Sequence, residues 1–387
     1  MKQIAVALLA TLAGLTTCSA QRIWTVDLVT SRPADFRDIP PAIAAASPGD
    51  TILVRLTSAL DFYSPFVLTK GVNIVPPHNG LIQVKGAIVI SNIPANERCN
   101  LSNIMGYPLT VKDCVGPVTI HGGYFPSVGG ARAMLVQNCK LVTMWGTGNA
   151  PMTVEGSTVV FIDSGLWYPY VGSAIVPLTL TNAKMTFVNS SLRGDPGQLD
   201  LINCTRIKFP FHAVNASNSD LILTGASSFC GGGTQSGGLY CNNLNLTAPA
   251  IVSTGAGVRV YAEPGVYIGA IQGPYTKTTI SLPQMSANYG APGFPVTTYL
   301  RSSRPNALAA LYASLPTVPY GSPFGELYLD STFCVLMDVG FTDAAGKRDF
   351  TFTLSPTAPL GWPLLFQSAL LVGSTVEVSA PMVVPTS

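Results

Sequence analysis

Charged side chains are scarce in this sequence. Asp, Glu, Lys and Arg together make up only 10% of the 387 residues, and the formal net charge is +2, whereas soluble domains usually carry about 25% charged residues. So small a net charge gives no electrostatic basis for attraction to nucleic acid or to an anionic membrane surface. We therefore expect no nucleic-acid partner.

Long apolar runs are also rare. Beyond residue 20, apolar and polar residues alternate, and no stretch reaches the roughly 18 uninterrupted apolar residues that a membrane-spanning helix requires. Such alternation is typical of β-strands, and the 37 glycines and 31 prolines can supply the turns between many short strands. The sequence therefore predicts an all-β chain without a membrane span.

The first twenty residues form a separate segment. Lys2 gives a positive start, residues 4–15 are apolar, and small residues precede Gln21. This pattern predicts a cleaved signal peptide over residues 1–20 and a secreted, extracellular or cell-surface protein, with the periplasm as a further destination. An alternative is a lipid anchor on Cys18, although Thr17 departs from the Gly, Ala or Ser expected just before a lipidated cysteine.

Metal-binding motifs are lacking as well. The chain has three histidines and no Cys-x-x-Cys pattern, so we expect no metal site. Of the eight cysteines, seven remain once Cys18 leaves with the signal peptide, so at least one thiol is unpaired. Cys230 and Cys241 bracket a glycine-rich loop that a disulfide between them would close.

A repeated pattern runs through residues 109–260. Each copy has an apolar-alternating stretch, a small polar pair and a second alternating stretch, and the interval varies from 18 residues (139 to 157) to 26 residues (157 to 183). A loose repeat of this length predicts a solenoid of short parallel strands. We expect one small residue per copy to join an inward stack of buried side chains. These residues are Cys114, Cys139, Ser157, Ala183 and Cys204.

Asparagine recurs next to that small residue. Asn138, Asn182 and Asn203 each stand directly before it. Asn adopts turn conformations readily, and stacked Asn side chains can hydrogen-bond to one another. We therefore expect a ladder of asparagines at the turns between strands.

A short helix is predicted ahead of the repeats. Phe36, Ile39 and Ile43 fall at helical spacing, Asp38 can cap the first turn, and Pro40 suits that turn. Strands are expected on both sides, at residues 22–31 and 51–55. A helix here would cover the open end of a solenoid, where backbone groups and apolar core are otherwise exposed.

Residues 35–54, with the strand pair that follows in residues 66–75, resemble the entry segment of secreted parallel β-helix proteins of the pectin-lyase-like superfamily. The closest likeness is to uncharacterised members from environmental bacteria. The resemblance covers roughly residues 35–277. It implies an all-β fold, a right-handed parallel β-helix with an N-terminal helical cap, which we expect to occupy residues 21–277.

The repeat stops near residue 277. Short strands joined by Pro- and Gly-containing turns fill the remainder, which predicts a C-terminal antiparallel β-sandwich over residues 278–387. We expect this domain to cap the other end of the solenoid or to attach the protein to another surface.

The same resemblance indicates which residues an active member would need. Polygalacturonase-like hydrolysis requires a set of carboxylates, but the Asp-Asp and Asn-Thr-Asp motifs are absent. A pectate-lyase-like site needs several acidic residues for calcium and a base. The weak candidates are Asp163, Arg193, Asp195, Asp200 and Arg206. Calcium would be bound only in that case, and no other cofactor is expected.

Aromatic residues give a second candidate site. Aromatic rings stack on the apolar faces of sugars, and the ring-bearing residues near predicted strand ends are Trp145, Trp167, Tyr168 and Tyr170. The alternative is that these rings pack loops against the solenoid.

Taken together, these patterns favour an exported, monomeric, non-catalytic β-helix protein that binds polysaccharide or has a structural role. The alternative is a divergent polysaccharide lyase or glycoside hydrolase. Because the repeats themselves are regular, we expect a site in the loops between strands, at residues 122–131, 163–176 and 189–198.

Overall fold

The computed structural model describes most of residues 21–385, so the predicted signal peptide, with Cys18, lies outside it. Nearly all of the described chain is β-structure, with one helix, α2 (Ile39–Ala45). Within this part, no helix combines the length and apolar character needed to cross a bilayer. The gaps in the description are residues 57–61, 78–79, 127–132, 149–150, 167–175, 195–197, 201–204, 209–211, 232–247, 256, 289–292, 323–324, 331–332 and 356–362.

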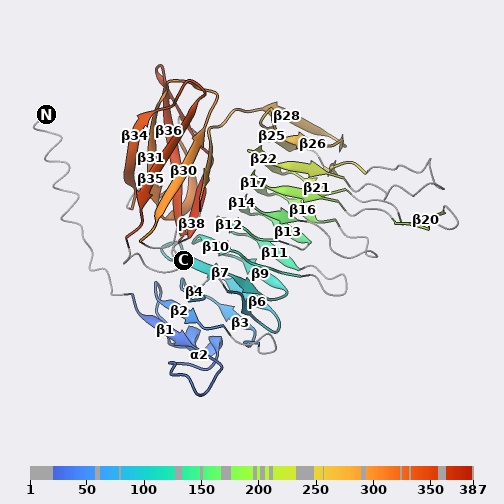
Figure 1. Ribbon diagram of the computed structural model, residues 1–387. Coiled ribbons are helices and arrows are strands. Elements are labelled where there is room, and N and C mark those ends of the chain that lie inside the picture. The colour runs from blue at the N-terminus through green and yellow to red at the C-terminus, as the bar shows by residue number, and fades with distance from the viewer. Residues whose placement is uncertain are drawn as a thin grey trace, which may run out of the picture.

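Two long parallel sheets form a β-helix (Figure 1). The chain alternates between them, and each strand pairs with the corresponding strand of the next coil, which confirms the predicted parallel solenoid. The eleven-stranded sheet contains, in order, β1 (Ile23–Val26), β2 (Thr51–Val54), β4 (Asn73–Val75), β7 (Cys99–Ser102), β10 (Val118–His121), β12 (Val142–Trp145), β14 (Thr158–Ile162), β17 (Lys184–Val188), β22 (Asp220–Thr224), β25 (Val258–Ala262) and β28 (Tyr275–Thr279).

The second sheet has nine strands, and shorter sheets complete the coils. Its strands are β3 (Phe66–Leu68), β6 (Ile88–Ser91), β9 (Leu109–Lys112), β11 (Met134–Gln137), β13 (Met152–Glu155), β16 (Leu178–Thr181), β21 (Val214–Ser217), β24 (Ile251–Ser253) and β27 (Ile271–Gln272). A four-stranded parallel sheet contains β15 (Gly165–Leu166), β18 (Ser191–Arg193), β23 (Ser228–Cys230) and β26 (Tyr267–Ile268), and β5 (Ile82–Gln83) pairs with β8 (Ile104–Met105).

The interior of the solenoid is a continuous apolar core. Alternate strand residues point inward, so that each inward side chain stacks on its counterpart in the next coil. Phe161, Phe187 and Phe229 pack edge to face, with ring centres 5.8 and 4.8 Å apart. Burial of this ladder is the main force that holds successive coils together.

The turn before each small residue adopts a left-handed backbone conformation. Asp113, Asn138, Gly156, Asn182 and Asn218 have φ between 46° and 55°, a region that Asn, Asp and Gly tolerate better than other residues. The Asn138 side chain donates to the Asp113 carboxylate at 3.0 Å. Asn138 and Asn182 thus occupy left-handed turns as predicted, but the hydrogen bond from Asn138 goes to an Asp and not to another Asn. The buried small residues that follow are Cys114, Cys139, Ser157, Ala183 and Ser219.

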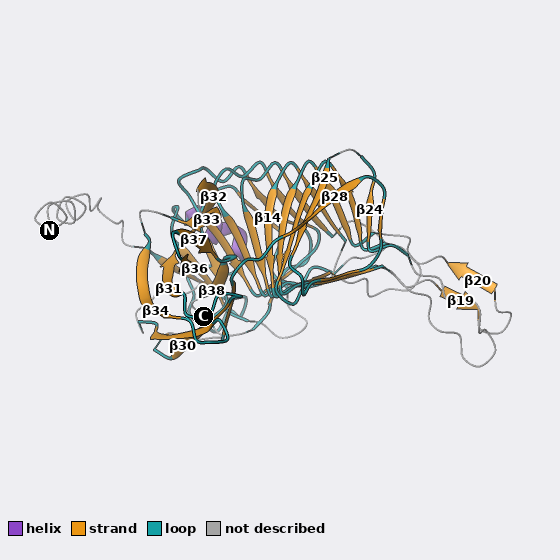
Figure 2. Ribbon diagram, turned by 90° about the horizontal axis from the view of Figure 1, so that it is seen from above, coloured by secondary structure: helices purple, strands orange, loops and turns teal. Residues whose placement is uncertain are grey.

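The last predicted copy of the repeat is wrong. β19 (Gln198–Asp200) and β20 (Thr205–Lys208) form an antiparallel hairpin that projects from the solenoid (Figure 2). Asn203 and Cys204 lie outside the described residues. The coil that follows β16 and β17 is instead formed by β21 and β22, so Ser219 takes the stack position that we assigned to Cys204.

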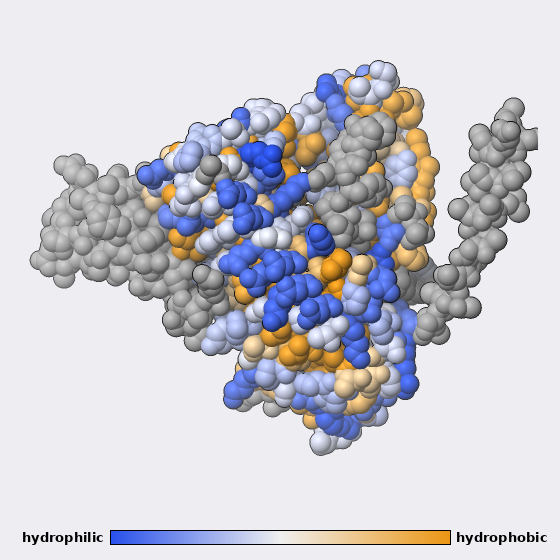
Figure 3. Space-filling model, turned by 180° about the vertical axis from the view of Figure 1, so that it is seen from behind, coloured by the Kyte–Doolittle hydropathy of each residue, from blue (hydrophilic) through white to orange (hydrophobic). Residues whose placement is uncertain are grey.

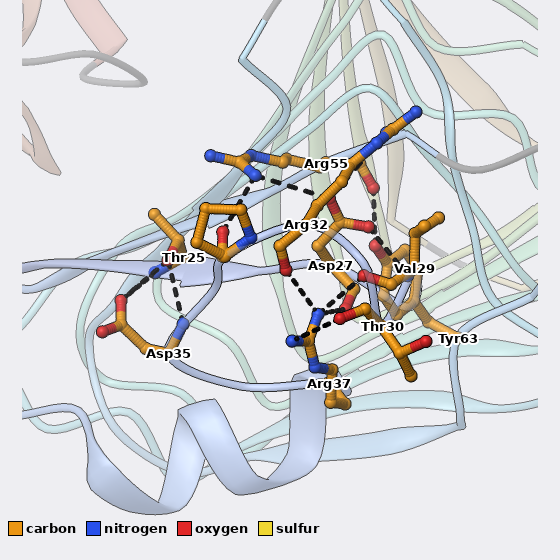
Figure 4. A network of polar contacts seen from close by, with 10 residues as sticks. Thr25, Asp27, Val29, Thr30, Arg32, Asp35, Arg37, Arg55 and Tyr63 are labelled. Carbon is orange, nitrogen blue, oxygen red and sulfur yellow. Dashed lines mark hydrogen bonds and ion pairs between the residues drawn. The ribbon is translucent and has the colours of Figure 1, made fainter.

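The N-terminal helix caps the solenoid as predicted. Asp38 accepts a hydrogen bond from the Ile39 amide at 2.8 Å, and α2 buries Ile39, Ala42 and Ile43 against the core. A polar network anchors the preceding loop (Figure 4): the Arg37 guanidinium donates to four backbone carbonyls, including those of Asp27 and Val29. These contacts are structural, since they close the end of the β-helix.

The C-terminal part is an antiparallel β-sandwich, as predicted. One sheet contains β29 (Gln284–Ala287), β30 (Pro295–Arg301) and β35 (Lys347–Thr353). Side chains of this sheet pack against those of the larger one, as Phe352 and Phe366 do at 5.1 Å between ring centres. The larger sheet contains β31 (Leu308–Ser314), β34 (Val335–Phe341), β36 (Pro363–Val372), β37 (Thr375–Val378) and β38 (Met382–Pro385), and β32 (Pro316–Ser322) pairs with β33 (Gly325–Leu329).

The sandwich does not cap the far end of the solenoid, which was the first of the two roles that we expected for it. It lies beside the β-helix, against the outer face of the eleven-stranded sheet (Figure 1). An apolar cluster joins Trp145, Val160 and Val188 of the solenoid to Tyr328 and Leu365 of the sandwich. Elsewhere the surface mixes hydrophilic and apolar residues, as the view from behind shows (Figure 3).

Candidate functional site

A row of polar side chains crosses the outer face of the eleven-stranded sheet. Strand alternation points these residues outward, and their backbones are paired directly from strand to strand, about 4.8 Å apart. All are buried. They are Thr51, Asn73, Asn100, Thr119 and Thr143. Successive coils thus repeat an amide or a hydroxyl at one fixed position.

A pocket of about 340 Å³ lies above part of this row. Asn73, Asn100 and Thr119 form its floor, Arg98 stands in one wall, and Phe333 of the sandwich contributes to the other. We call it the amide pocket. It exists because the sandwich rests on β12, β14 and β17 and overhangs the polar strands beside them.

The charged groups of the amide pocket already have structural partners. The Glu97 carboxylate accepts a hydrogen bond from the Gly71 amide at 2.6 Å. Arg98 forms an ion pair with Asp330 of the sandwich, and its guanidinium lies 5.7 Å from the centre of the Phe333 ring. The hydrogen-bonding character of the floor therefore comes from neutral amides and hydroxyls.

A histidine and a tryptophan stack beside this pocket. The rings of His121 and Trp145 are 4.3 Å apart, Nδ1 of His121 lies 3.0 Å from the Ser102 hydroxyl, and the Trp145 indole donates to Asp163 at 3.1 Å. Burial lowers the pKa of His121 to about 4. A base works best when its pKa is near the working pH, so His121 is poorly suited to proton transfer near neutrality.

A second pocket, of about 320 Å³, opens on the other side of the apolar contact. Thr186, Ile222 and Tyr261 supply its floor from β17, β22 and β25, and Tyr328 and Ala380 of the sandwich cover it. We call it the Thr186 pocket. Its lining is mostly apolar, in contrast to the amide pocket.

The catalytic candidates that the structure describes lie on separate elements. Asp163 occupies a left-handed turn (φ 45°) and accepts the Trp145 hydrogen bond. Arg193 is exposed on β18, paired with Cys230. Asp200 and Arg206 lie on the projecting hairpin (Figure 2), and Asp195 is outside the described residues. Among the described residues, no group of three or more His, Cys, Asp or Glu side chains is placed to hold a metal ion.

Two other sequence-based site predictions need correction. Trp145 is only 4% exposed and packs under the sandwich, so it offers no platform for a sugar. Cys230 carries a free thiol, so the predicted disulfide with Cys241 is not formed. Cys241 lies outside the described residues, as do the remaining aromatic candidates, Trp167, Tyr168 and Tyr170.

The sequence-based search missed both pockets. It placed the site in the loops between strands, whereas the pocket floors consist of strand residues. A signal was present in the single Thr or Asn that each of the strands at 51–54, 73–75, 99–102 and 118–121 contains. Their importance depends on where the sandwich docks, which no local pattern indicates.

No family model matches this chain, and no curated protein matches it. Several solved structures show weak likeness, and three of them are described here. The sporulation control protein Spo0M of Bacillus subtilis shares 12% identity over 27% of this chain and 49% of its own, with a TM-score of 0.17. Tailspike protein 2 of the Escherichia coli O157:H7 bacteriophage CAB120 shares 12% identity over 87% and 55%, with a TM-score of 0.20.

The third is WceF of Pantoea stewartii, a glycan biofilm modifying enzyme with a tailspike-like parallel β-helix fold. It shares 9% identity over 87% of this chain and 50% of its own, with a TM-score of 0.24. The chain thus spans about half the length of each of these structures. At such low TM-scores these likenesses carry no argument about activity, and the fold described above rests on the hydrogen-bonded sheets of this chain.

Proposed function

We propose that this protein binds a polysaccharide in the amide pocket and does not cleave it. The observation that carries the proposal is the row of amides and hydroxyls on consecutive coils, three of which form the pocket floor. A row that repeats at each coil is suited to a ligand that is itself a repeating polymer.

The chemistry of the pocket fits neutral sugars. An Asn side chain donates and accepts hydrogen bonds, and a Thr hydroxyl does both, so Asn73, Asn100 and Thr119 can satisfy the mixed donors and acceptors of sugar hydroxyls. Phe333 is 54% exposed at the wall. Its ring can stack on the apolar face of a sugar ring.

The charged groups support binding without turnover. Glycoside hydrolysis uses two carboxylates placed on either side of the scissile bond, and calcium-dependent elimination uses several carboxylates with a base. In the amide pocket, Glu97 is bonded to the Gly71 amide and Arg98 is paired with Asp330. Neither arrangement supplies an acid and a base facing a common ligand.

The test is a polysaccharide panel assayed for binding and for products. We expect at least one neutral polymer to bind without new reducing ends or unsaturated products. Asn100→Leu and Thr119→Val should each weaken that binding by roughly tenfold, the equivalent of about 1.4 kcal/mol for lost hydrogen bonds. Thr179→Val on β16, in the nine-stranded sheet, is the matched control and should bind normally.

Two outcomes would overturn this proposal. The first is a lack of binding to every polymer of the panel. The second is turnover that Glu97→Gln abolishes, which would replace the binding function with the divergent lyase or hydrolase alternative.

We also propose that the protein is exported as a monomer after removal of residues 1–20. Sequencing of the secreted chain should begin at Gln21, and light scattering should give the mass of one chain. Retention in the membrane fraction that Cys18→Ser releases would instead indicate a lipid anchor.

A further inference from the structure

Two buried cysteines lie one above the other in neighbouring coils of the solenoid. Cys114 and Cys139 each follow the left-handed turn residue of their coil, and they are 0% and 2% exposed. The strands that precede them are paired in register, with Lys112 opposite Gln137, and the Lys140 amide donates to the Cys114 carbonyl at 2.9 Å. The two thiols lie within hydrogen-bonding reach of each other.

The spacing of the coils is compatible with a disulfide bond between these residues. Equivalent residues of adjacent parallel strands are about 4.8 Å apart, and the Cα atoms of a disulfide-bonded pair usually lie roughly 4.4–6.8 Å apart. The structure holds both cysteines as thiols, which donate to the carbonyls of Lys112 and Gln137 at 3.3 and 3.2 Å. It therefore shows the reduced form of the pair.

Packing alone does not require cysteine at this position. In the coils that follow, Ser157, Ala183 and Ser219 occupy the same place in the stack. The Ser157 hydroxyl donates to the Glu155 carbonyl at 2.8 Å, as the Cys139 thiol does to the carbonyl two residues before it. Serine therefore fits the same space with the same contact. What distinguishes the two cysteine coils is that adjacent thiols can form a covalent bond.

We propose that Cys114 and Cys139 form a disulfide bond that joins two adjacent coils of the solenoid. The two thiols lose two protons and two electrons, which reduce the disulfide of an oxidant, such as oxidised glutathione, to two thiols. Because both cysteines are buried in the folded protein, the bond forms while the chain folds, before the coils close around it. It then links the coil that supplies Thr119 to the amide pocket with the coil that supplies Trp145 to the contact between the domains.

Cys99 provides a matched control. It is also buried, at 1% exposed, but its paired residue in the next coil is Val118, so no cysteine stacks on it from that side. Trypsin cleaves after lysine and arginine, and it separates the three cysteines. The resulting peptides are residues 99–112 with Cys99, residues 113–132 with Cys114 and residues 133–140 with Cys139.

The experiment is mass spectrometry of the full chain refolded from urea in a buffer of oxidised and reduced glutathione. The product is alkylated in urea and digested without reduction. We expect peptide 113–132 joined to peptide 133–140 with the loss of two hydrogens, and peptide 99–112 in its alkylated form. Recovery of the first two peptides unlinked, whether alkylated or carrying glutathione, would overturn the proposal. A link from peptide 113–132 to any other cysteine would also overturn it.

Substitution with serine tests whether the bond stabilises the solenoid. After refolding in the glutathione buffer, Cys114→Ser should unfold at a temperature roughly 5–10 °C below that of the wild-type protein. Cys139→Ser should behave alike, whereas Cys99→Ser should keep the link between the two peptides. After refolding in dithiothreitol, the difference between Cys114→Ser and the wild-type protein should disappear. Equal unfolding temperatures of the two in the glutathione buffer would refute the stabilising role of the bond.

Discussion

The amide pocket and the Thr186 pocket lie on the same face of one sheet, on either side of one contact with the sandwich, yet they differ in chemistry. Asn73, Asn100 and Thr119 give the first an amide and hydroxyl floor, while Thr186, Ile222 and Tyr261 give the second a mostly apolar one. These residues occupy the same outward row of the sheet. Inward residues must stack on one another to hold the coils together. Only the outward residues are therefore free to differ in chemistry from one coil to the next along the solenoid axis.

The apolar contact between the pockets determines where both of them lie. Trp145, Val160 and Val188 are outward residues of β12, β14 and β17, and the sandwich covers them. Burying such side chains stabilises the contact by roughly 25 cal/mol for each Å² of apolar surface removed from water. The sandwich overhangs the outward residues on either side of this contact. Those on one side are polar and those on the other are polar and apolar, and they form the floors of the two pockets.

The largest predicted effect comes from removing the centre of this contact. Trp145→Ala should lower the free energy of unfolding by about 3–5 kcal/mol, because it leaves a large cavity and removes the donor to Asp163. Urea denaturation measures the change. Ligand binding in the amide pocket should also weaken, since that pocket depends on the docked sandwich.

Phe341→Ala is the control for that change. Phe341 is 65% exposed on β34, so its removal should change stability by no more than about 0.5 kcal/mol. If Trp145→Ala left ligand binding in the amide pocket unchanged, the dependence of that pocket on the docked sandwich would be refuted.

Acid should lower the free energy of unfolding through His121, which lies beside the amide pocket. Its pKa is lowered by burial to about 4 in the folded protein, against about 6.5 when unfolded. Below pH 6.5 the unfolded chain therefore takes up a proton that the folded protein resists. The stability contribution is complete above pH 6.5 and is lost as the pH falls towards 4, by up to about 3 kcal/mol.

Urea unfolding between pH 7 and 4.5 tests this effect. His121→Gln should make the loss of stability with acid shallower than in the wild-type protein. His212 is half-buried, and this burial also lowers its pKa, so His212→Gln serves as the comparison. An unchanged slope in His121→Gln would contradict the assignment.

The sequence predicted the solenoid because its pattern has a direct physical cause. Left-handed turns favour Asn138 and Asn182, and small residues such as Cys139 fit the crowded interior behind them. The same pattern misled us over residues 198–208, because Asn203 and Cys204 reproduce it. The local sequence pattern specifies a strand, a turn and a second strand. Whether these elements form a coil or a hairpin is decided by stacking on the preceding coil.

The candidate site was not predictable in the same way. Its floor comes from several coils and its wall from Phe333, more than 200 residues further along the chain than Thr119 (333 − 119 = 214). Trp145 shows the difficulty, since an aromatic residue at a strand end suits either an exposed platform or a buried contact. Only the position of the sandwich distinguishes the two.

The smallest predicted effect concerns the ion pair that links the domains at the amide pocket. Arg98 and Asp330 are 30% and 15% exposed, so a double-mutant cycle with Arg98→Met and Asp330→Asn should give a coupling energy of about 1 kcal/mol in stability.

The control is the pair of Arg259 and Asp220, which lies within the solenoid beside the Thr186 pocket. Breaking the first pair should weaken ligand binding in the amide pocket alone, because it loosens the wall that carries Phe333. Breaking the second should leave the amide pocket unchanged. If breaking the second pair weakened binding in the amide pocket as much as breaking the first, the two pockets would have to be regarded as one continuous site, and the chemical contrast between their floors would be a gradient within it.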